Sequence, residues 1–334
     1  MRAEQTQAPY RRRRSDRRDS DVADLVARAR AGQARAVARL ISLVEDASPK
    51  LRAVSAALVR HAGHAQIIGL TGPPGVGKST TTTALVTAFR AAGKRVGVLA
   101  VDPSSPFSGG ALLGDRVRMQ DHALDPDVFI RSMASRGHLG GLAWATPQAL
   151  RVLDATGCDV VFIETVGVGQ AEVEIAQLAD STMVLLAPGM GDGIQAAKAG
   201  ILEVADLYVV NKADRDGAQQ TVRDLRYMLS LGGRHSEAGA WRRPILSTVA
   251  TRGEGIEEVV AALDKHRIWL ENTGERAHRQ QERAAAEIEA IAVSALRARM
   301  GDVHGSAALG TLAARVVGGE LDPYAAADVL IDEL

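Results

Sequence analysis

The chain is poor in several features that mark particular classes of protein. It contains one cysteine, Cys158, in 334 residues, so it forms no internal disulfide, and we expect a reducing, cytoplasmic location. Aromatic residues make up 3%, which leaves little material for a platform on which nucleic-acid bases could stack. No apolar run approaches the roughly 18 residues of a membrane span, and the polar start lacks the apolar segment of a secretory signal.

An excess of charge of either sign is also missing. Forty acidic residues balance 40 basic residues, which argues against a protein that coats nucleic acid. Hydrophobic residues make up 46% and charged residues 24%, as in ordinary globular proteins. We therefore expect a folded protein of about two domains, with neither nucleic acid nor a membrane among its partners.

Four regions follow one another along the chain. Residues 1–20 are rich in arginine without apolar periodicity, which predicts a disordered tail or, alternatively, a docking arm for an acidic partner. Residues 21–62 carry apolar side chains at helical spacing and predict an N-terminal helical segment. Residues 63–270 alternate short apolar runs with helical patterns. Residues 271–334 lack such runs and predict a helical arm, beginning with an amphipathic helix over 275–300.

The apolar runs of the third region predict the strands of a parallel sheet. They lie at Ile67–Thr71, Val96–Val101, Val160–Ile163, Met183–Leu186 and Leu207–Val210, with Ile245-Leu246 as a sixth candidate. Buried strands that alternate with helices indicate an α/β fold whose mostly parallel sheet is covered by helices on both faces.

A glycine-rich loop directly follows the first of these strands. Residues Gly72-Pro73-Pro74-Gly75-Val76-Gly77-Lys78-Ser79 match the pattern G-x-x-x-x-G-K-[ST] at every fixed position, and Thr80 continues into a predicted helix. In this pattern the backbone N–H groups surround phosphate oxygens, and the helix N-terminus adds its positive end. We expect Lys78 to reach the β- and γ-phosphates and the Ser79 hydroxyl to bind Mg²⁺. The motif predicts the fold of a P-loop nucleoside triphosphatase.

A second motif follows the strand Leu207–Val210. Asn211-Lys212-Ala213-Asp214 matches N-K-x-D, in which the Asp214 carboxylate accepts hydrogen bonds from the N1–H and amino group of guanine. Adenine lacks both donors, so it would leave the carboxylate unpaired, at a cost of ~1–3 kcal/mol. Asn211 is expected to brace the surrounding loops and the stem of Lys212 to lie along the base. The motif therefore predicts selection of GTP over ATP.

A third nucleotide-binding element is expected after the sixth strand candidate. Ser247–Ile256 includes Val249-Ala250-Thr251, where many GTPases carry Ser-Ala ahead of a Gly-x-Gly-Ile turn. We expect the Ala250 N–H to donate to guanine O6. The valine at 249 departs from the usual serine, so the side-chain contacts of this loop stay undefined.

Three acidic residues follow strands or adjoin glycine-rich loops. Asp102 ends a strand, Asp115 lies in the loop Pro106–Met119, and Glu164 begins Glu164-Thr165-Val166-Gly167, an E-x-x-G in the place of the usual D-x-x-G. Carboxylate oxygens at strand ends suit Mg²⁺, and each of the three is a candidate ligand, a helix cap or a surface charge. Gly167 is expected to donate its N–H to the γ-phosphate and so to sense hydrolysis.

These motifs together resemble the MeaB/ArgK/MMAA family of GTPases, in the metallochaperone branch of the SIMIBI class. The resemblance extends from about residue 21 to the C-terminus. It rests on Gly72–Thr80, Val101–Ser105, Gly114–Arg116, Glu164–Gln170, Gly191–Gln195 and Asn211–Asp214.

The resemblance implies a homodimeric GTPase that binds GTP, GDP and Mg²⁺ and dimerises through the C-terminal helical arm. It further implies that GTP hydrolysis gates delivery of adenosylcobalamin to methylmalonyl-CoA mutase and protects the mutase. It also implies switch roles for the loops after Asp102, Glu164 and Pro188. Three alternatives stay open: a phosphotransferase that uses the same loop, a GTPase chaperone for another metalloenzyme, and a GTP-dependent scaffold.

Overall fold

The computed structural model describes residues 21–103, 120–122, 124–135, 145–165, 171–189, 201–231, 239–300 and 307–332. The chain divides into two compact units, Met1–Arg279 and Gln280–Leu334, which are described separately. Within the described ranges no helix is both long enough and apolar enough to cross a bilayer. The predicted tail over residues 1–20 lies outside the described residues.

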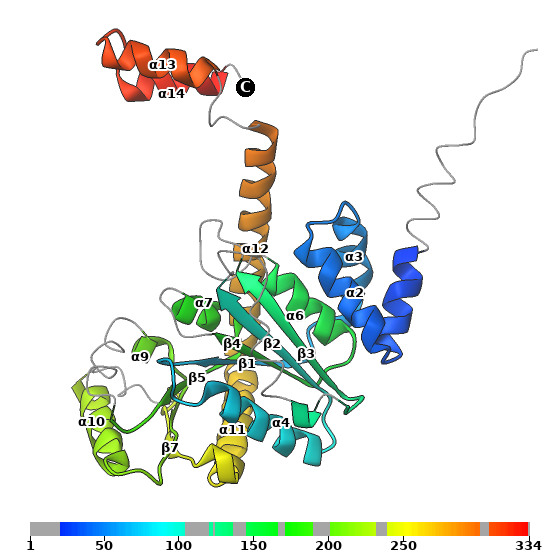
Figure 1. The fold of residues 1–334 in the computed structure, drawn as a ribbon, viewed down its shortest axis with the longest axis vertical. Coiled ribbons are helices and arrows are strands. Elements are labelled where there is room, and N and C mark those ends of the chain that lie inside the picture. Colours follow the sequence, from blue (N-terminus) through cyan, green and yellow to red (C-terminus); the bar gives the residue numbers. More distant parts are fainter. Residues whose placement is uncertain are drawn as a thin grey trace, which may run out of the picture. The chain divides into compact units, whose positions relative to one another are not determined.

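A seven-stranded sheet forms the centre of the first unit (Figure 1). Its strands are β1 (Gln66–Thr71), β2 (Val96–Pro103), β3 (Val128–Ser135), β4 (Val160–Thr165), β5 (Ser181–Leu186), β6 (Leu207–Val210) and β7 (Ile245–Ser247). Their order is β3-β2-β4-β1-β5-β6-β7, and every paired strand runs parallel to its neighbours. The predicted parallel α/β fold is confirmed, whereas β3 was absent from the predicted strands.

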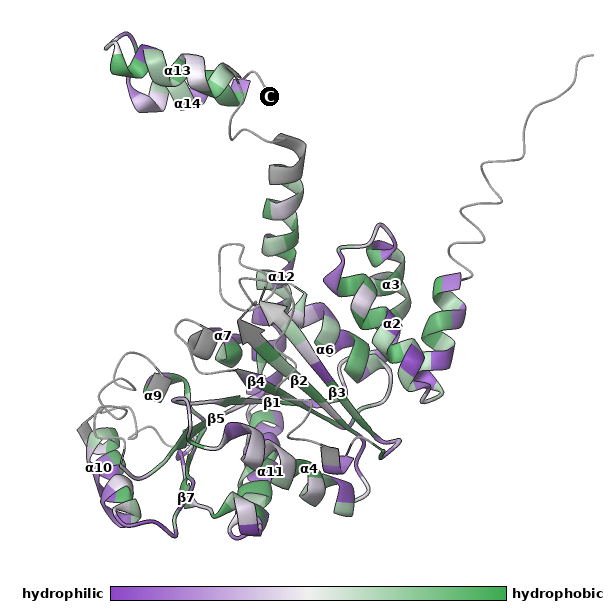
Figure 2. Ribbon diagram, in the orientation of Figure 1, coloured by the Kyte–Doolittle hydropathy of each residue, from purple (hydrophilic) through white to green (hydrophobic). Residues whose placement is uncertain are grey.

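Strand β5 illustrates why these runs are apolar at every position. Met183 and Leu185 pack into the core on one face of the sheet, while Val184 and Leu186 pack into the core on the other. All six residues of the strand are buried, because helices cover both faces. Figure 2 shows the hydrophobic residues concentrated in the strands.

Helices cover the two faces of the sheet. One face packs against α4 (Lys78–Ala91) and α11 (Ile256–Thr273). The other face packs against α6 (Thr146–Ala155), α7 (Ala171–Leu178) and the N-terminal helices. Near β5 and β6 lie α9 (Ile201–Val204) and α10 (Ala218–Leu231). The short 3₁₀ helices η1 (Val59–His61), η2 (Gln120–His122) and η3 (Ala250–Arg252) complete the unit.

The N-terminal helices add a layer to the side of the sheet that α6 covers. Residues 21–30 are helical, and α2 (Ala34–Glu45) and α3 (Leu51–Leu58) follow. Leu40 and Ile41 of α2 are fully buried in the same core as Leu153 of α6. The predicted helical N-terminal segment is therefore confirmed as part of the first unit's core.

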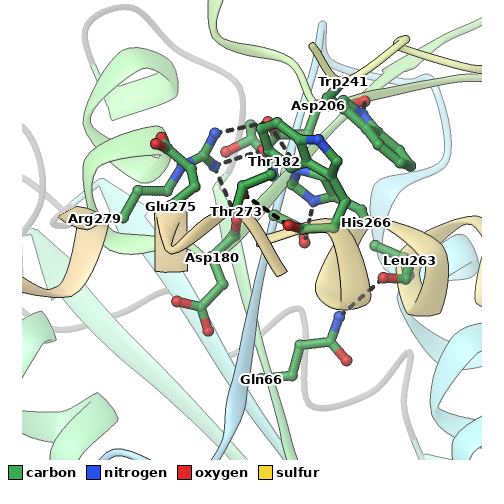
Figure 3. Close-up of polar contacts among 12 residues, drawn as sticks. Gln66, Asp180, Thr182, Asp206, Trp241, Leu263, His266, Thr273, Glu275 and Arg279 are labelled. Carbon is green, nitrogen blue, oxygen red and sulfur yellow. Dashed lines mark hydrogen bonds and ion pairs between the residues drawn. The ribbon is translucent and has the colours of Figure 1, made fainter. Parts of the chain in front are cut away.

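A buried polar cluster fixes the start of α12 (Glu275–Met300) against the strand ends opposite the glycine-rich loop (Figure 3). The Arg279 guanidinium donates to both carboxylate oxygens of Asp206, at 3.1 Å each, and to the Asp180 carbonyl at 2.9 Å. The fully buried His266 lies with Nε2 3.4 Å from Asp206 Oδ1 and Nδ1 2.8 Å from the Ser181 hydroxyl. Burial lowers the pKa of His266 to about 4, so this histidine is neutral.

The second unit is helical. After the rest of α12 it contains α13 (Ala307–Val317) and α14 (Pro323–Asp332), which pack on each other and bury Leu312 and Ala326. The break between α13 and α14 begins at the pair Gly318-Gly319, where Gly319 has a φ of +72°. On α12, Ile288, Ile291 and Leu296 are exposed.

Candidate functional site

The glycine-rich loop lies at the carboxyl end of β1, beside β4 and β5, and leads into α4 (Figure 1). Gly72 has a φ of +140°, and a Cβ there would come within 2.2 Å of the Leu185 carbonyl oxygen. Gly77 has a φ of +96°, and a Cβ there would come within 2.5 Å of Asn211 Nδ2. Both positions therefore need glycine, because the backbone passes too close to its neighbours for any side chain.

Lys78 is folded over this loop. Its Nζ donates to the carbonyl oxygens of Gly72 at 2.7 Å and Pro73 at 3.1 Å, and the side chain is buried. An ammonium group held by two carbonyl dipoles can exchange those bonds for stronger ones to phosphate oxygens. The lysine therefore stands where the sequence motif requires a phosphate-binding cation.

Two of the predicted magnesium ligands are in direct contact. The Ser79 hydroxyl, in the first turn of α4, donates to Glu164 Oε1 at 2.5 Å, and Glu164 lies near the end of β4. Both side chains are buried. A hydroxyl and a carboxylate at the mouth of the loop are a hard-oxygen donor set that suits Mg²⁺, which keeps several waters and takes few protein ligands. The residues present therefore fit the predicted ion.

The other predicted residues of this group are described only in part. The backbone of Asp102 lies near the carboxyl end of β2, one residue beyond the pair that Val101 forms with Thr165 of β4. The side chain of Asp102, and Asp115 and Gly167 altogether, lie outside the described part of the structure. So do the predicted switch loops over 104–114 and 166–170 and residues 190–193 of the predicted switch segment 188–193.

Asn211 joins the glycine-rich loop to the loop after β7. Its Nδ2 donates to the Val76 carbonyl at 2.9 Å. Its Oδ1 accepts from the Thr248 hydroxyl and from the Ala250 N–H, each at 3.1 Å. The side chain is buried, so these bonds are shielded from water. The predicted bracing contacts of Asn211 are thus present as three hydrogen bonds.

The rest of the base motif faces outward. The Lys212 Nζ donates to the Gly75 carbonyl at 2.6 Å, and Lys212 has a φ of +56°, which is uncommon outside glycine. Asp214 is exposed in the turn that follows, and the Ala213 N–H anchors that turn on the Thr248 carbonyl at 3.0 Å. The carboxylate is therefore accessible to a ligand without any rearrangement of the core.

The third element lies beside this motif. Val249 pairs with Glu254 in an isolated bridge, which closes the turn that contains Ala250 and the exposed Thr251. The Ala250 N–H, which the sequence assigns to guanine O6, here donates to Asn211. To reach a base, that N–H has to share or exchange this hydrogen bond. Its role toward guanine stays a prediction.

Two residues of the site were absent from the prediction. Thr82 donates to Glu164 Oε2 at 3.1 Å, and Thr248 donates to Asn211. Thr82 stands three residues after Ser79 on the same helix, so a helical projection places the two hydroxyls on one face. This spacing was the signal in the sequence that could have identified Thr82 as a neighbour of Ser79. For Thr248 the sequence carries no comparable signal, because the contact depends on how two distant loops meet.

A cavity of about 530 Å³ lies elsewhere, at the amino ends of the strands, and contains none of these residues. Its walls include Arg60, Asp154, Cys158 and Arg276. The Asp154 carboxylate accepts hydrogen bonds from the N–H groups of the segment just before β1. Burial raises the pKa of the Cys158 thiol to about 12, so the cysteine is no nucleophile at neutral pH. The cavity carries no part of the predicted chemistry.

The parallel sheet and the loop with its lysine and serine define a P-loop nucleotide-binding protein. The family model of the methylmalonyl Co-A mutase-associated GTPase MeaB matches residues 37–304, and the chain belongs to this family. It is therefore a GTPase, and the predicted family is confirmed.

Individual relatives agree with this assignment. A protein of Pyrococcus abyssi named as a GTPase is 47% identical over 94% of this chain and 97% of its own length. The GTPase ArgK of Escherichia coli is 36% identical over 77% of this chain and 79% of its own length. Among solved structures, an LAO/AO transport system kinase superposes with a TM-score of 0.70 at 25% identity, over 94% of this chain and 97% of that one.

Proposed function

We propose that this GTPase is a switch that chaperones an adenosylcobalamin-dependent methylmalonyl-CoA mutase, gating delivery of the cofactor and protecting the mutase. The observation that carries the proposal is the match over residues 37–304 to a family described as associated with that mutase. The hydrogen-bonded nucleotide site supports it, because a switch needs loops that a nucleotide can rearrange.

In this proposal the triphosphate lies in the loop Gly72–Thr80. Lys78 exchanges the carbonyls of Gly72 and Pro73 for oxygens of the β- and γ-phosphates. The backbone N–H groups of the loop and the N-terminus of α4 share the remaining negative charge. Water then attacks the γ-phosphorus in line, the bond from that phosphorus to the bridging oxygen breaks, and GDP leaves with this oxygen while the water's proton leaves with inorganic phosphate. The Gly167 N–H senses departure of the phosphate. Intrinsic turnover is slow, roughly 10⁻⁴ to 10⁻² s⁻¹, as in related GTPases without a partner.

In this proposal Ser79 and the carboxylates of Asp102, Asp115 and Glu164 would hold Mg²⁺, directly or through water. The ion neutralises charge that develops on the phosphates. The contact between Ser79 and Glu164 supports this assignment, because a hydroxyl that donates its proton to the carboxylate keeps two lone pairs that would be available to an ion.

Guanine is read by Asp214, with Lys212 along the base and the loop Val249-Ala250-Thr251 at its O6 edge. The exposure of Asp214 and the bracing of its loop by Asn211 support this role. The carboxylate accepts two hydrogen bonds that adenine cannot donate.

The second unit is proposed to be the dimerisation arm of a cytoplasmic homodimer. Exposed apolar side chains on α12, among them Ile288, Ile291 and Leu296, support this because a partner helix would cover them. A two-fold symmetric pair is the commonest arrangement for such an interface.

The deciding experiment measures hydrolysis of GTP and of ATP by the purified chain, with and without methylmalonyl-CoA mutase from the same organism. GTP-selective hydrolysis that the mutase changes at least about tenfold, within the range of partner effects on GTPases, supports the proposal. The matched control is the Lys78→Ala variant, which should show no hydrolysis with or without the mutase. Hydrolysis of GTP that is indifferent to the mutase would refute the client assignment, and preference for ATP would refute the base assignment.

A further inference from the structure

The first turns of helix α4 contain a run of hydroxyl side chains, Ser79 to Thr83. Most of these hydroxyls donate to backbone carbonyls one helical turn earlier. Thr81 donates to the Gly77 carbonyl at 2.9 Å, and Thr83 donates to the Ser79 carbonyl at 2.9 Å. Threonine side chains in helices commonly donate to the carbonyl four residues earlier, as these two do. They point to no function.

Thr82 differs from its neighbours. Its Oγ1 lies 3.1 Å from the Lys78 carbonyl and also 3.1 Å from Glu164 Oε2, on a strand 82 residues further along the chain. A hydroxyl has one proton to donate, and an ionised carboxylate is the stronger acceptor of the two. The proton of Thr82 is therefore directed at Glu164.

The Glu164 carboxylate is thus held from both sides by one face of one helix. Ser79 donates to Oε1 at 2.5 Å and Thr82 donates to Oε2. Thr82 is fully buried and Glu164 nearly so. Hydrogen bonds that are shielded from water restrain the orientation of the Glu164 carboxylate more strongly than exposed ones would. Ser79 is also expected to bind the metal ion through its lone pairs, whereas Thr82 has no predicted role at the ion and holds the carboxylate.

We propose that Thr82 is a positioning residue for the metal site: it holds Oε2 of Glu164 so that Oε1 stays aimed at the ion and its waters when Ser79 binds the metal. This inference rests on the proposed function, in which Glu164 and Ser79 serve Mg²⁺. Without Thr82 the carboxylate loses the hydroxyl that donates to Oε2, so its last torsion, which is broad, is restrained less tightly.

The test measures metal binding rather than turnover. Mn²⁺ is titrated into the full-length protein saturated with GDP, and the free ion is followed by electron paramagnetic resonance. Thr82→Val keeps the shape and removes the hydroxyl, and we expect Mn²⁺ to bind about fivefold to tenfold more weakly, which corresponds to the typical net contribution of one hydrogen bond. Thr82→Ser restores the hydroxyl and should restore the affinity.

Two further variants make the result specific. Thr83→Val removes another hydroxyl of the same helical turn. Among the contacts described, this hydroxyl donates only to a backbone carbonyl, so the Thr83→Val variant should bind Mn²⁺ like the parent protein. Thr82→Ala is measured beside Thr82→Val, so that poor folding of one variant does not decide the outcome. Unchanged or tighter Mn²⁺ binding by the folded Thr82 variants, or failure of Thr82→Ser to restore affinity, would overturn the proposal.

A double-mutant cycle separates this inference from the proposed function beneath it. In a Glu164→Gln background, Thr82→Val should have no further effect on Mn²⁺ affinity, because its partner charge is gone. An equal loss in that background would overturn the positioning role alone. If Glu164→Gln itself left Mn²⁺ affinity unchanged, the metal role of Glu164 would fail, and the role of Thr82 with it.

Discussion

Replacing Asn211 with alanine should cost the protein stability before it costs nucleotide selectivity. The side chain makes three neutral hydrogen bonds in a buried setting, to the Val76 carbonyl, the Thr248 hydroxyl and the Ala250 N–H. At about 1 kcal/mol each, their loss lowers the free energy of unfolding by about 3 kcal/mol. Part of that loss should appear as weaker GDP binding, because Asn211 ties the phosphate loop to the loop after β7.

The matched control is Asp214→Ala in the same motif. Asp214 is exposed, so its removal should change the free energy of unfolding by less than about 0.5 kcal/mol. It should nevertheless abolish the preference for GTP over ATP. Urea denaturation followed by circular dichroism measures the first quantity, and competition against a fluorescent GDP analogue measures the second. If Asn211→Ala were as stable as the parent protein, the bracing role derived from its three hydrogen bonds would be wrong.

Three further predictions concern individual positions. Lys78→Ala should weaken binding of a fluorescent GTP analogue by about 10-fold to 100-fold, since a charge-assisted contact is lost; unchanged affinity would remove Lys78 from the phosphate site. Gly72→Ala should strain the loop by about 1–3 kcal/mol, because its Cβ meets the Leu185 carbonyl at 2.2 Å, and both stability in urea and GDP affinity should fall. The pKa of His266 is lowered by burial to about 4, so the unfolded chain takes up the proton first, and stability should decline between about pH 6.5 and pH 4 by up to roughly 3 kcal/mol. His266→Gln should flatten that decline in denaturation curves recorded across the range, and an unchanged slope would assign it to other groups.

The sequence predicted the central strands and β7 at one edge of the sheet, and it missed β3 at the other edge. β1, β4, β5 and β6 are continuous apolar runs because helices cover them on two sides. β3 pairs only with β2, and after Val128–Ile130 it continues with Arg131 and Ser132. In β3 these polar residues interrupt the apolar run, so a rule based on apolar runs passes over this strand.

The polar contacts also divide into those that the sequence predicted and those that it did not. Ser79 and Glu164 were predicted to serve one ion, and they meet because strands β1 and β4 are neighbours in the sheet. Sequence motifs do not give the order of the strands. They indicate only that residues expected to bind the same ligand lie close together. The cluster of Asp206, His266 and Arg279 was not predicted, because no ligand chemistry connects these residues and only the packing of α11 and α12 brings them together.

The two edges of the sheet show how a binding site differs from a structural polar cluster. At the amino edge the Arg279 guanidinium already donates to the carboxylates of Asp206 and Glu275 and to a carbonyl, so its positive charge is held by acceptors of opposite charge. At the carboxyl edge Lys78 donates to carbonyls and Ser79 donates to a carboxylate, and a triphosphate with a divalent ion provides stronger partners for both. Both edges hold hydrogen-bonded polar side chains, but Arg279 and Glu275 are partly exposed, whereas Lys78 and Ser79 are buried. What singles out the carboxyl edge is that its bonds can be exchanged for better ones, and that property follows from residue types that the sequence already displays.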